Sequence, residues 1–259
     1  MSENGVNIKP VLDDYIKNVT SELKIRWNNW PKDLIENNVY EVIGGILSRQ
    51  SSLAIQLALN MNIWNEEISP IILRTMADNH INLAWILIDP NEHSKKFILH
   101  GLGQLKLELE HRKNNLPEDN PEMEELLKQE EEFINSQRYT FLTDVNLGSW
   151  SGLNTRKMAE ESDLIDFYNY VYQPFSNCTH STWAHISKYN VRVSENPLHC
   201  FLKQPTIIDF EPHISYMDIG AKYLEKSFKA FDKRFELGIK IESSYEKFIE
   251  DFNQTIEKK

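Results

Sequence analysis

Cysteine, glycine and proline are all scarce in this chain. Cys178 and Cys200 are the only cysteines among 259 residues, and they form no CxxC pair. We interpret both as small buried hydrophobic residues of a protein from a reducing compartment. Nine glycines and ten prolines leave long stretches without turn signals, which favours helices over many short strands.

Long hydrophobic runs are absent as well. The longest strictly apolar run, Leu83 to Ile88, is far shorter than the roughly 20 residues that cross a bilayer. The first ten residues, MSENGVNIKP, lack the apolar core of a signal peptide. We therefore expect a cytoplasmic protein that has no membrane partner.

Basic residues are outnumbered, and the formal net charge of −11 opposes non-specific attraction to nucleic acid. The excess is local, because residues 108–132 hold ten acids against Arg112, Lys113 and Lys128. That balance of −7 leaves −4 for the rest of the chain, so a basic groove elsewhere stays compatible with the sequence. We interpret 108–132 as a solvated helical arm.

Apolar residues recur at three- and four-residue steps, which is typical of amphipathic helices. This spacing predicts helices over roughly 9–30, 38–61, 65–89, 91–115, 119–137, 155–161, 163–188 and 213–259, the last with a break near Gly238. Pro174 predicts a kink or a fresh first turn inside 163–188. For 189–212 we expect coil, with at most one short strand at the β-branched run Thr206–Ile208.

The fold predicted from these segments is an all-α bundle of about seven to eight helices, with no substantial sheet. Residues 1–190 would form the main helical bundle. Residues 191–212 would be an irregular connection, and the helices of 213–259 would pack on the same domain.

Two polar stripes interrupt the apolar pattern. Tyr168, Tyr172, Ser176 and His180 are four residues apart, so on a helix they would share one face. A second set with the same spacing, Arg74, Asp78 and Asn82, lies in one of the most apolar segments. These stripes are the candidate functional site.

No P-loop, nucleophile elbow or HExxH motif is present. A di-iron bundle needs two Glu-x-x-His pairs, and only Glu108 with His111 matches. We therefore expect neither a metal nor another cofactor.

The R-x(4–6)-H signature of the HEPN helical ribonucleases matches at Arg74 with His80 and at Arg192 with His199. Eight arginines and eight histidines would give roughly one such match by chance. Six residues turn a helix by about 600°, which leaves Arg74 and His80 about 120° apart. Arg74 and Asp78 differ by only about 40° on the same helix.

The stripes resemble a mainly bacterial, all-helical family catalogued as domain of unknown function 5677, over roughly residues 40–190. That family has an arginine with a carboxylate four residues later, then a tryptophan, an arginine followed by Glu, and Tyr, Ser and His at four-residue steps. The corresponding positions here are Arg74, Asp78, Trp150, Arg156, Ala159, Glu160, Tyr172, Ser176 and His180. Asp78 departs from the usual Glu, and Pro174 interrupts the stripe. The resemblance implies an all-α fold and no particular activity.

Three hypotheses remain open for the stripes. In the first, the polar groups form a buried hydrogen-bond network that fixes helix register. In the second, the protein is a metal-independent endoribonuclease of HEPN-like type: His180 is the general acid or base, Arg74 binds a phosphate, and Asp78 positions Arg74. Tyr172 and Ser176 would then orient His180 or bind substrate.

The third hypothesis is a binding module that captures a nucleotide or a partner helix without chemistry. The acidic segment 108–132 and the aromatic row Phe228, Phe231 and Phe235 could support a homo-oligomer. For the aromatic row alone, core packing is the preferred interpretation. Trp150 would serve either as a lid over the site or as an apolar anchor for its loop. We interpret His185 as a packing or surface residue.

Overall fold

The computed structural model describes residues 7–115, 120–137 and 148–257, and the protein is 74% helical. The predicted all-α class is therefore confirmed. The helices are α1 Lys9–Asn29, α2 Asn37–Leu59, α3 Ser69–Ile86, α4 Pro90–Asn114, α5 Pro121–Ser136, α6 Thr155–Glu161, α7 Ile165–Phe167, α8 Gln173–Thr179, α9 Trp183–Tyr189, α10 Ser215–Arg234 and α11 Ser244–Glu257. Short 3₁₀ turns occupy Leu34–Glu36, Met61–Ile63 and Pro197–His199.

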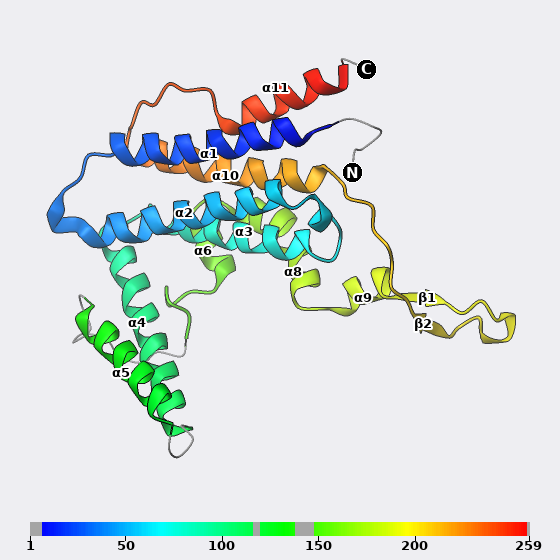
Figure 1. Cartoon of the computed structure of the whole chain (residues 1–259), viewed down its shortest axis with the longest axis horizontal. Coiled ribbons are helices and arrows are strands. Elements are labelled where there is room, and N and C mark those ends of the chain that lie inside the picture. The colour runs from blue at the N-terminus through cyan, green and yellow to red at the C-terminus, as the bar shows by residue number, and fades with distance from the viewer. Residues whose placement is uncertain (1–6, 116–119, 138–147, 258–259) are drawn as a thin grey trace.

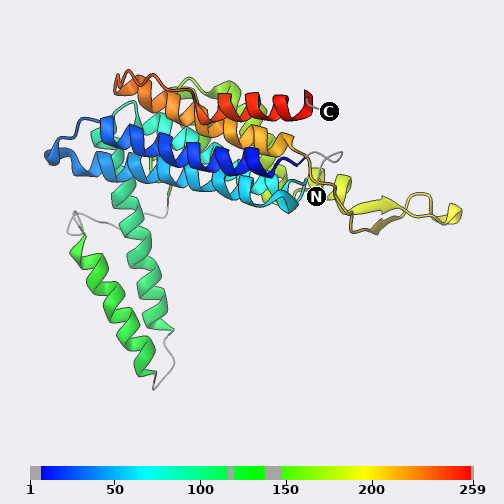
Figure 2. The ribbon, with the colours of Figure 1, turned by 45° about the horizontal axis from the view of Figure 1, so that its top comes forward.

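The main bundle is built from long helices that lie side by side (Figure 1). α10 packs against both α2 and α3, while α1 packs against α2 and α11. Two pieces project from this bundle in both views: the hairpin of α4 and α5, and, at the other end, a two-stranded arm (Figure 2).

The core of the bundle is where the apolar stripes of these helices meet. Tyr15 of α1, Leu57 of α2 and Leu224 of α10 are at most 1% exposed. Gly220 permits the close approach of α10, because a Cβ at that position would overlap the Leu57 side chain. α2 also has the length and composition of a membrane-crossing helix, but 56% of its apolar window is buried inside this bundle.

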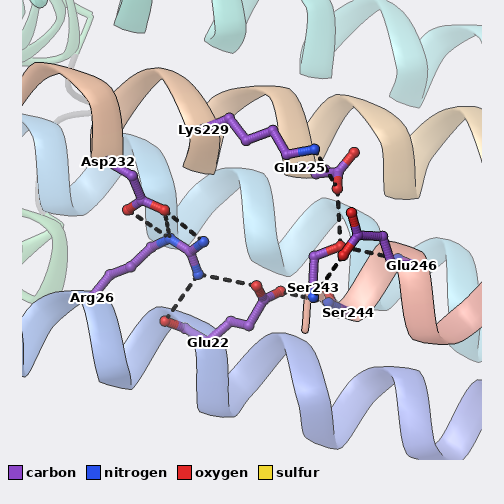
Figure 3. A network of polar contacts seen from close by, with 8 residues as sticks. All are labelled: Glu22, Arg26, Glu225, Lys229, Asp232, Ser243, Ser244 and Glu246. Carbon is purple, nitrogen blue, oxygen red and sulfur yellow. Dashed lines mark hydrogen bonds and ion pairs between the residues drawn. The ribbon is translucent and has the colours of Figure 1, made fainter. Parts of the chain in front are cut away.

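A buried ion-pair network ties α1 to the C-terminal helices (Figure 3). Arg26 donates through Nη2 to Asp232 at 2.8 Å and through Nη1 to Glu22 at 3.1 Å. The other carboxylate oxygen of Glu22 accepts the backbone N–H of Ser244 at 3.0 Å. Burial raises the pKa of Asp232, although its hydrogen bond to Arg26 acts in the opposite direction. Such a network fixes how α10 and α11 sit on α1.

The number of helices differs from the prediction. The described residues contain ten helices rather than seven to eight, if the run from Ile165 to Thr179 is counted as one. One cause is the predicted helix 163–188, which is divided after Thr179.

The division occurs at Ser181, which has a left-handed φ of 46°. The N–H of Ser181 donates to Cys178 O and the N–H of Thr182 to Asn177 O, both at 3.0 Å. This is the Schellman pattern of a helix end, where glycine is the usual left-handed residue. In this glycine-poor chain a serine stands there, so the sequence carried no visible stop signal.

The projecting arm consists of β1 Val191–Val193 paired antiparallel with β2 Lys203–Pro205. The short strand expected at Thr206–Ile208 is therefore wrong: these residues follow β2, and Ile207 is fully exposed. The inference that both cysteines are buried also fails for one of them. Cys178 is buried, but Cys200 is exposed because it follows the 3₁₀ turn at the far end of this hairpin.

Candidate functional site

The two polar stripes face each other across the contact of α3 with α8. Arg74, which is 7% exposed, donates through Nε to Ser176 Oγ at 2.8 Å and through Nη1 to the carboxylate of Asp78. The guanidinium carbon lies 3.2 Å from the centroid of the Tyr172 ring. We call Arg74, Asp78, Tyr172 and Ser176 the Arg74 cluster.

A π-helical turn over Tyr168–Tyr172 sets the register of this contact. The N–H of Gln173 donates to Tyr168 O, a step of five residues instead of four. Pro174 follows at once in the first turn of α8, where its missing N–H costs little. The kink predicted at Pro174 thus takes the form of a π-turn, a feature frequent at functional sites. Tyr168 itself stacks on Tyr172, with ring centroids 4.7 Å apart.

The hydroxyl groups of the cluster are fully used. Ser176 Oγ accepts from Arg74 and donates to the carbonyl oxygen of Tyr172 at 3.1 Å. The Tyr172 hydroxyl lies 3.2 Å from Thr155 Oγ1, at the first turn of α6. Thr155 was not singled out from the sequence, because a threonine at a helix start is common and carries no chemical signature.

Asp78 is the ionisable group of the cluster that reaches solvent, with a side chain 38% exposed. Burial raises its pKa, and this effect outweighs the lowering by Arg74, by a hydrogen bond from Tyr172 and by the charge of His180. The carboxyl group therefore keeps a proton to higher pH than an ordinary aspartate.

His180 lies at the C-terminal end of α8, as its exposed capping residue. Its side chain makes no hydrogen bond within the described part of the chain, but its charge still influences Asp78. The predicted four-residue stripe therefore divides in function: Tyr172 and Ser176 hold Arg74, whereas His180 remains accessible beside them.

Arg156 and Glu160 lie on the exposed surface of α6 and pair with each other at 3.3 Å. Lys157 shares this carboxylate, and its hydrogen bond is the main reason that the pKa of Glu160 is lowered, ahead of that from Arg156. Among the described residues neither Arg156 nor Glu160 contacts Arg74. They belong to the same helix as Thr155, which does join the cluster.

Trp150 packs against Trp85 and Phe97, with ring centroids 5.2 and 4.9 Å away. It lies in the same apolar cluster as Tyr168 and Tyr172. These contacts are those of an apolar anchor for the loop that leads into α6.

The two other histidines weighed from the sequence have structural contacts. His80 is 4% exposed and turns away from Arg74 toward α10, where Nδ1 lies 3.0 Å from Ser227 Oγ. Burial lowers its pKa from 6.5 to about 4. His185, also buried, lies 3.3 Å from the carboxylate of Glu67 at the start of α3. Arg74 and His80, which match the HEPN signature, therefore contact different residues: Arg74 contacts Ser176 and Asp78, and His80 contacts Ser227.

The family comparison covers the elements that carry this site. Residues 40–197 match a family of unknown function, DUF5677. The chain belongs to this family. The DUF5677 region runs from α2 to the arm and includes all of the Arg74 cluster and His180. No curated protein and no solved structure matches the chain. Among the described residues, no group of three or more His, Cys, Asp and Glu side chains could hold a metal ion.

Proposed function

We propose that this DUF5677 protein is a metal-independent endoribonuclease whose site is the Arg74 cluster with His180. One observation carries the proposal: a cation held in a fixed position lies beside two titratable groups that reach solvent. Arg74 is fixed by Asp78, Ser176 and the Tyr172 ring. Acid–base groups next to a fixed cation are what phosphoryl transfer without a metal requires.

In the proposed reaction, the imidazole of His180 accepts the proton of an RNA 2′-hydroxyl. The 2′-oxygen then attacks the adjacent phosphorus, and the bond from phosphorus to the 5′-oxygen breaks. Asp78 stays paired with Arg74 and holds it in place, while the leaving 5′-oxygen takes a proton from solvent. The products are a 2′,3′-cyclic phosphate and a 5′-hydroxyl, and His180 then releases its proton to solvent.

Arg74 would stabilise the negative charge that grows on the phosphate oxygens. Its Nε and Nη1 are occupied by Ser176 and Asp78, while Nη2 has no hydrogen-bond acceptor within the described residues. That nitrogen is the donor available to a substrate. Tyr172 and Ser176 act as positioning residues, because their contacts are with the guanidinium.

The acidic composition of the chain is compatible with an RNA substrate. Residues 108–132 carry −7 of the net charge of −11. The described residues of this segment, 108–115 and 120–132, belong to α4 and α5, which project from the bundle away from α8 (Figure 1). The repulsion of RNA is therefore concentrated away from the proposed site and is further screened at physiological salt.

The test uses a short RNA with a fluorophore and a quencher, incubated with the full chain in the presence of EDTA. We expect cleavage that yields 2′,3′-cyclic phosphate ends. The matched control is the same sequence as DNA, which lacks the attacking hydroxyl and should stay intact. Cleavage of both substrates, or cleavage that EDTA abolishes, would contradict the proposal. Intact RNA with a folded protein would favour the structural-network hypothesis.

A further inference from the structure

The tip of the arm exposes large apolar side chains. Phe201 is 98% exposed and Leu198 is 88% exposed. They lie in the connection between β1 and β2, and both views show the arm extending clear of the helices (Figures 1 and 2). A two-stranded hairpin alone is marginally stable in water. Exposed apolar groups on such a hairpin are typical of a contact surface.

An apolar pocket of about 350 Å³ lies at the other end of the bundle, between α1, α2 and α10. Four of the residues that line it are aromatic: Trp27, Trp30, Tyr40 and Phe231. A volume in this range accepts a small group of apolar atoms.

Two consecutive glycines in α2 shape this pocket. Glycine in a helix interior is destabilising relative to alanine, so each of these glycines needs a reason. For Gly44 the reason is packing, because a Cβ there would lie 3.1 Å from the Trp27 ring. At Gly45 a Cβ would meet nothing within 4 Å. The missing side chain at Gly45 leaves the pocket open, which points to an occupant from outside the molecule.

We propose that the occupant is the arm of a second copy of this chain, with Phe201 and Leu198 inserted into the pocket. The turn between α1 and α2, next to the pocket, and the arm lie at opposite ends of the molecule (Figures 1 and 2), so one chain does not bring them together. An aromatic side chain in an aromatic pocket is a typical anchor of an interface.

Charge complements this contact. Residues 191–205 hold Arg192 and Lys203 against Glu195, a net charge of +1. The pocket lining includes Glu41, which is exposed and has no partner among the described residues. Arg26, the other charged residue of the lining, is neutralised by Glu22 and Asp232. On the arm Arg192 pairs with Glu195 at 3.3 Å, so Lys203, two residues after Phe201, is the cation that would meet Glu41 at the rim of the pocket.

Each copy offers one arm and one pocket. Two copies related by a two-fold axis would make two identical contacts and close as a dimer, while other rotations would give a ring or an open filament. The inference is independent of the proposed ribonuclease chemistry, because the arm tip and pocket share no residue with the Arg74 cluster.

The test is sedimentation of the full chain over a range of concentrations. We expect self-association in the wild type, weakened at least tenfold by Phe201→Asp on the arm and by Gly45→Leu in the pocket. Phe133→Asp is the matched control, since Phe133 is 60% exposed on α5 and lies outside the contact. Circular dichroism of each variant separates a lost contact from a lost fold, and Leu198→Asp gives a second arm variant.

Mixing the two defective variants is the most decisive part of the test. Phe201→Asp keeps its pocket and Gly45→Leu keeps its arm, so one contact can form between them and association should return. A wild type that stays monomeric, or a mixture that stays monomeric while the wild type associates, would overturn the proposal. So would loss of association only in Phe133→Asp, which would assign the contact to α5.

Crosslinking from Cys200 can identify the residues at the contact directly. It is exposed next to Phe201, whereas Cys178 is buried, so a benzophenone maleimide would label the arm tip selectively. Irradiation should crosslink this label to peptides containing residues 27–48 of another copy, and Cys200→Ser removes the signal. Crosslinks confined to α5 or to the same copy would contradict the assignment.

Discussion

The guanidinium of Arg74 lies 3.2 Å from the ring centroid of Tyr172, across the contact between α3 and the π-turn that precedes α8. These residues come from two stripes nearly a hundred positions apart in the chain. Their contact makes Arg74 both a structural link between the two helices and a fixed cation. The consequences for stability, pH dependence and activity can be measured separately.

Replacing Arg74 by methionine should destabilise the fold. The change leaves Ser176 Oγ without its donor and Asp78 without its ion pair. We expect a loss of about 2 kcal/mol in the free energy of unfolding, below the range for a fully buried pair because Asp78 is partly exposed. Urea unfolding of Arg74→Met, Asp78→Asn and the double variant measures the coupling. Strictly additive losses would contradict the ion pair.

Asp78 should make the protein less stable as the pH rises. Its native pKa lies above the ordinary 3.8, so the native state binds this proton more tightly than the unfolded state does. The resulting stabilisation is full below pH 3.8 and is lost as the pH rises through the native pKa. Asp78→Asn should remove this dependence in a series of unfolding curves. An unchanged pH profile in the variant would show that another group is responsible.

His80 should make the protein less stable as the pH falls, which is opposite to the effect of Asp78. Its pKa is about 4 in the native state and 6.5 when unperturbed, so the unfolded state binds the proton first as the pH falls. The protein should therefore lose up to roughly 3 kcal/mol of stability between pH 6.5 and pH 4. His80→Gln should flatten this part of the profile, whereas His199→Gln on the exposed arm should not. The same acid sensitivity in all three proteins would exclude His80 as its source.

Replacing Glu236 by glycine should stabilise the protein. It ends α10 with a left-handed φ of 50°, and the N–H of Leu237 donates to Asp232 O in the Schellman pattern. Glycine adopts this conformation without steric cost, so Glu236→Gly should gain about 1 kcal/mol, which corresponds to roughly 2–4 °C in the thermal midpoint. Glu236→Ala is the control and should not be stabilised. Equal midpoints for the two variants would refute the argument.

Four-residue spacing predicted that Arg74 lies near Asp78 and Tyr172 near Ser176 on one helix face each. It could not predict that the two faces meet, because that depends on how α3 packs against α8. The division between α8 and α9 could not be predicted, because Ser181 adopts a left-handed conformation that is usually occupied by glycine. The exposure of Cys200 depends on the hairpin that carries it. Thr155 joins the cluster through tertiary packing alone. The spacing of residues therefore predicts which side chains share a helix face. Where a helix ends, and which residues of short segments contact the site, can be known only from the three-dimensional structure.

The central claim is that His180 and the Arg74 cluster cleave RNA. The most direct measurement compares the RNA cleavage rates of the wild type, His180→Asn and His199→Asn in EDTA, with thermal midpoints recorded for all three. His180 is exposed, so its replacement should leave the midpoint within about 2 °C and lower the rate at least a hundredfold, the scale of general acid–base catalysis. His199→Asn should match the wild type. Equal rates for His180→Asn and wild type would contradict the account.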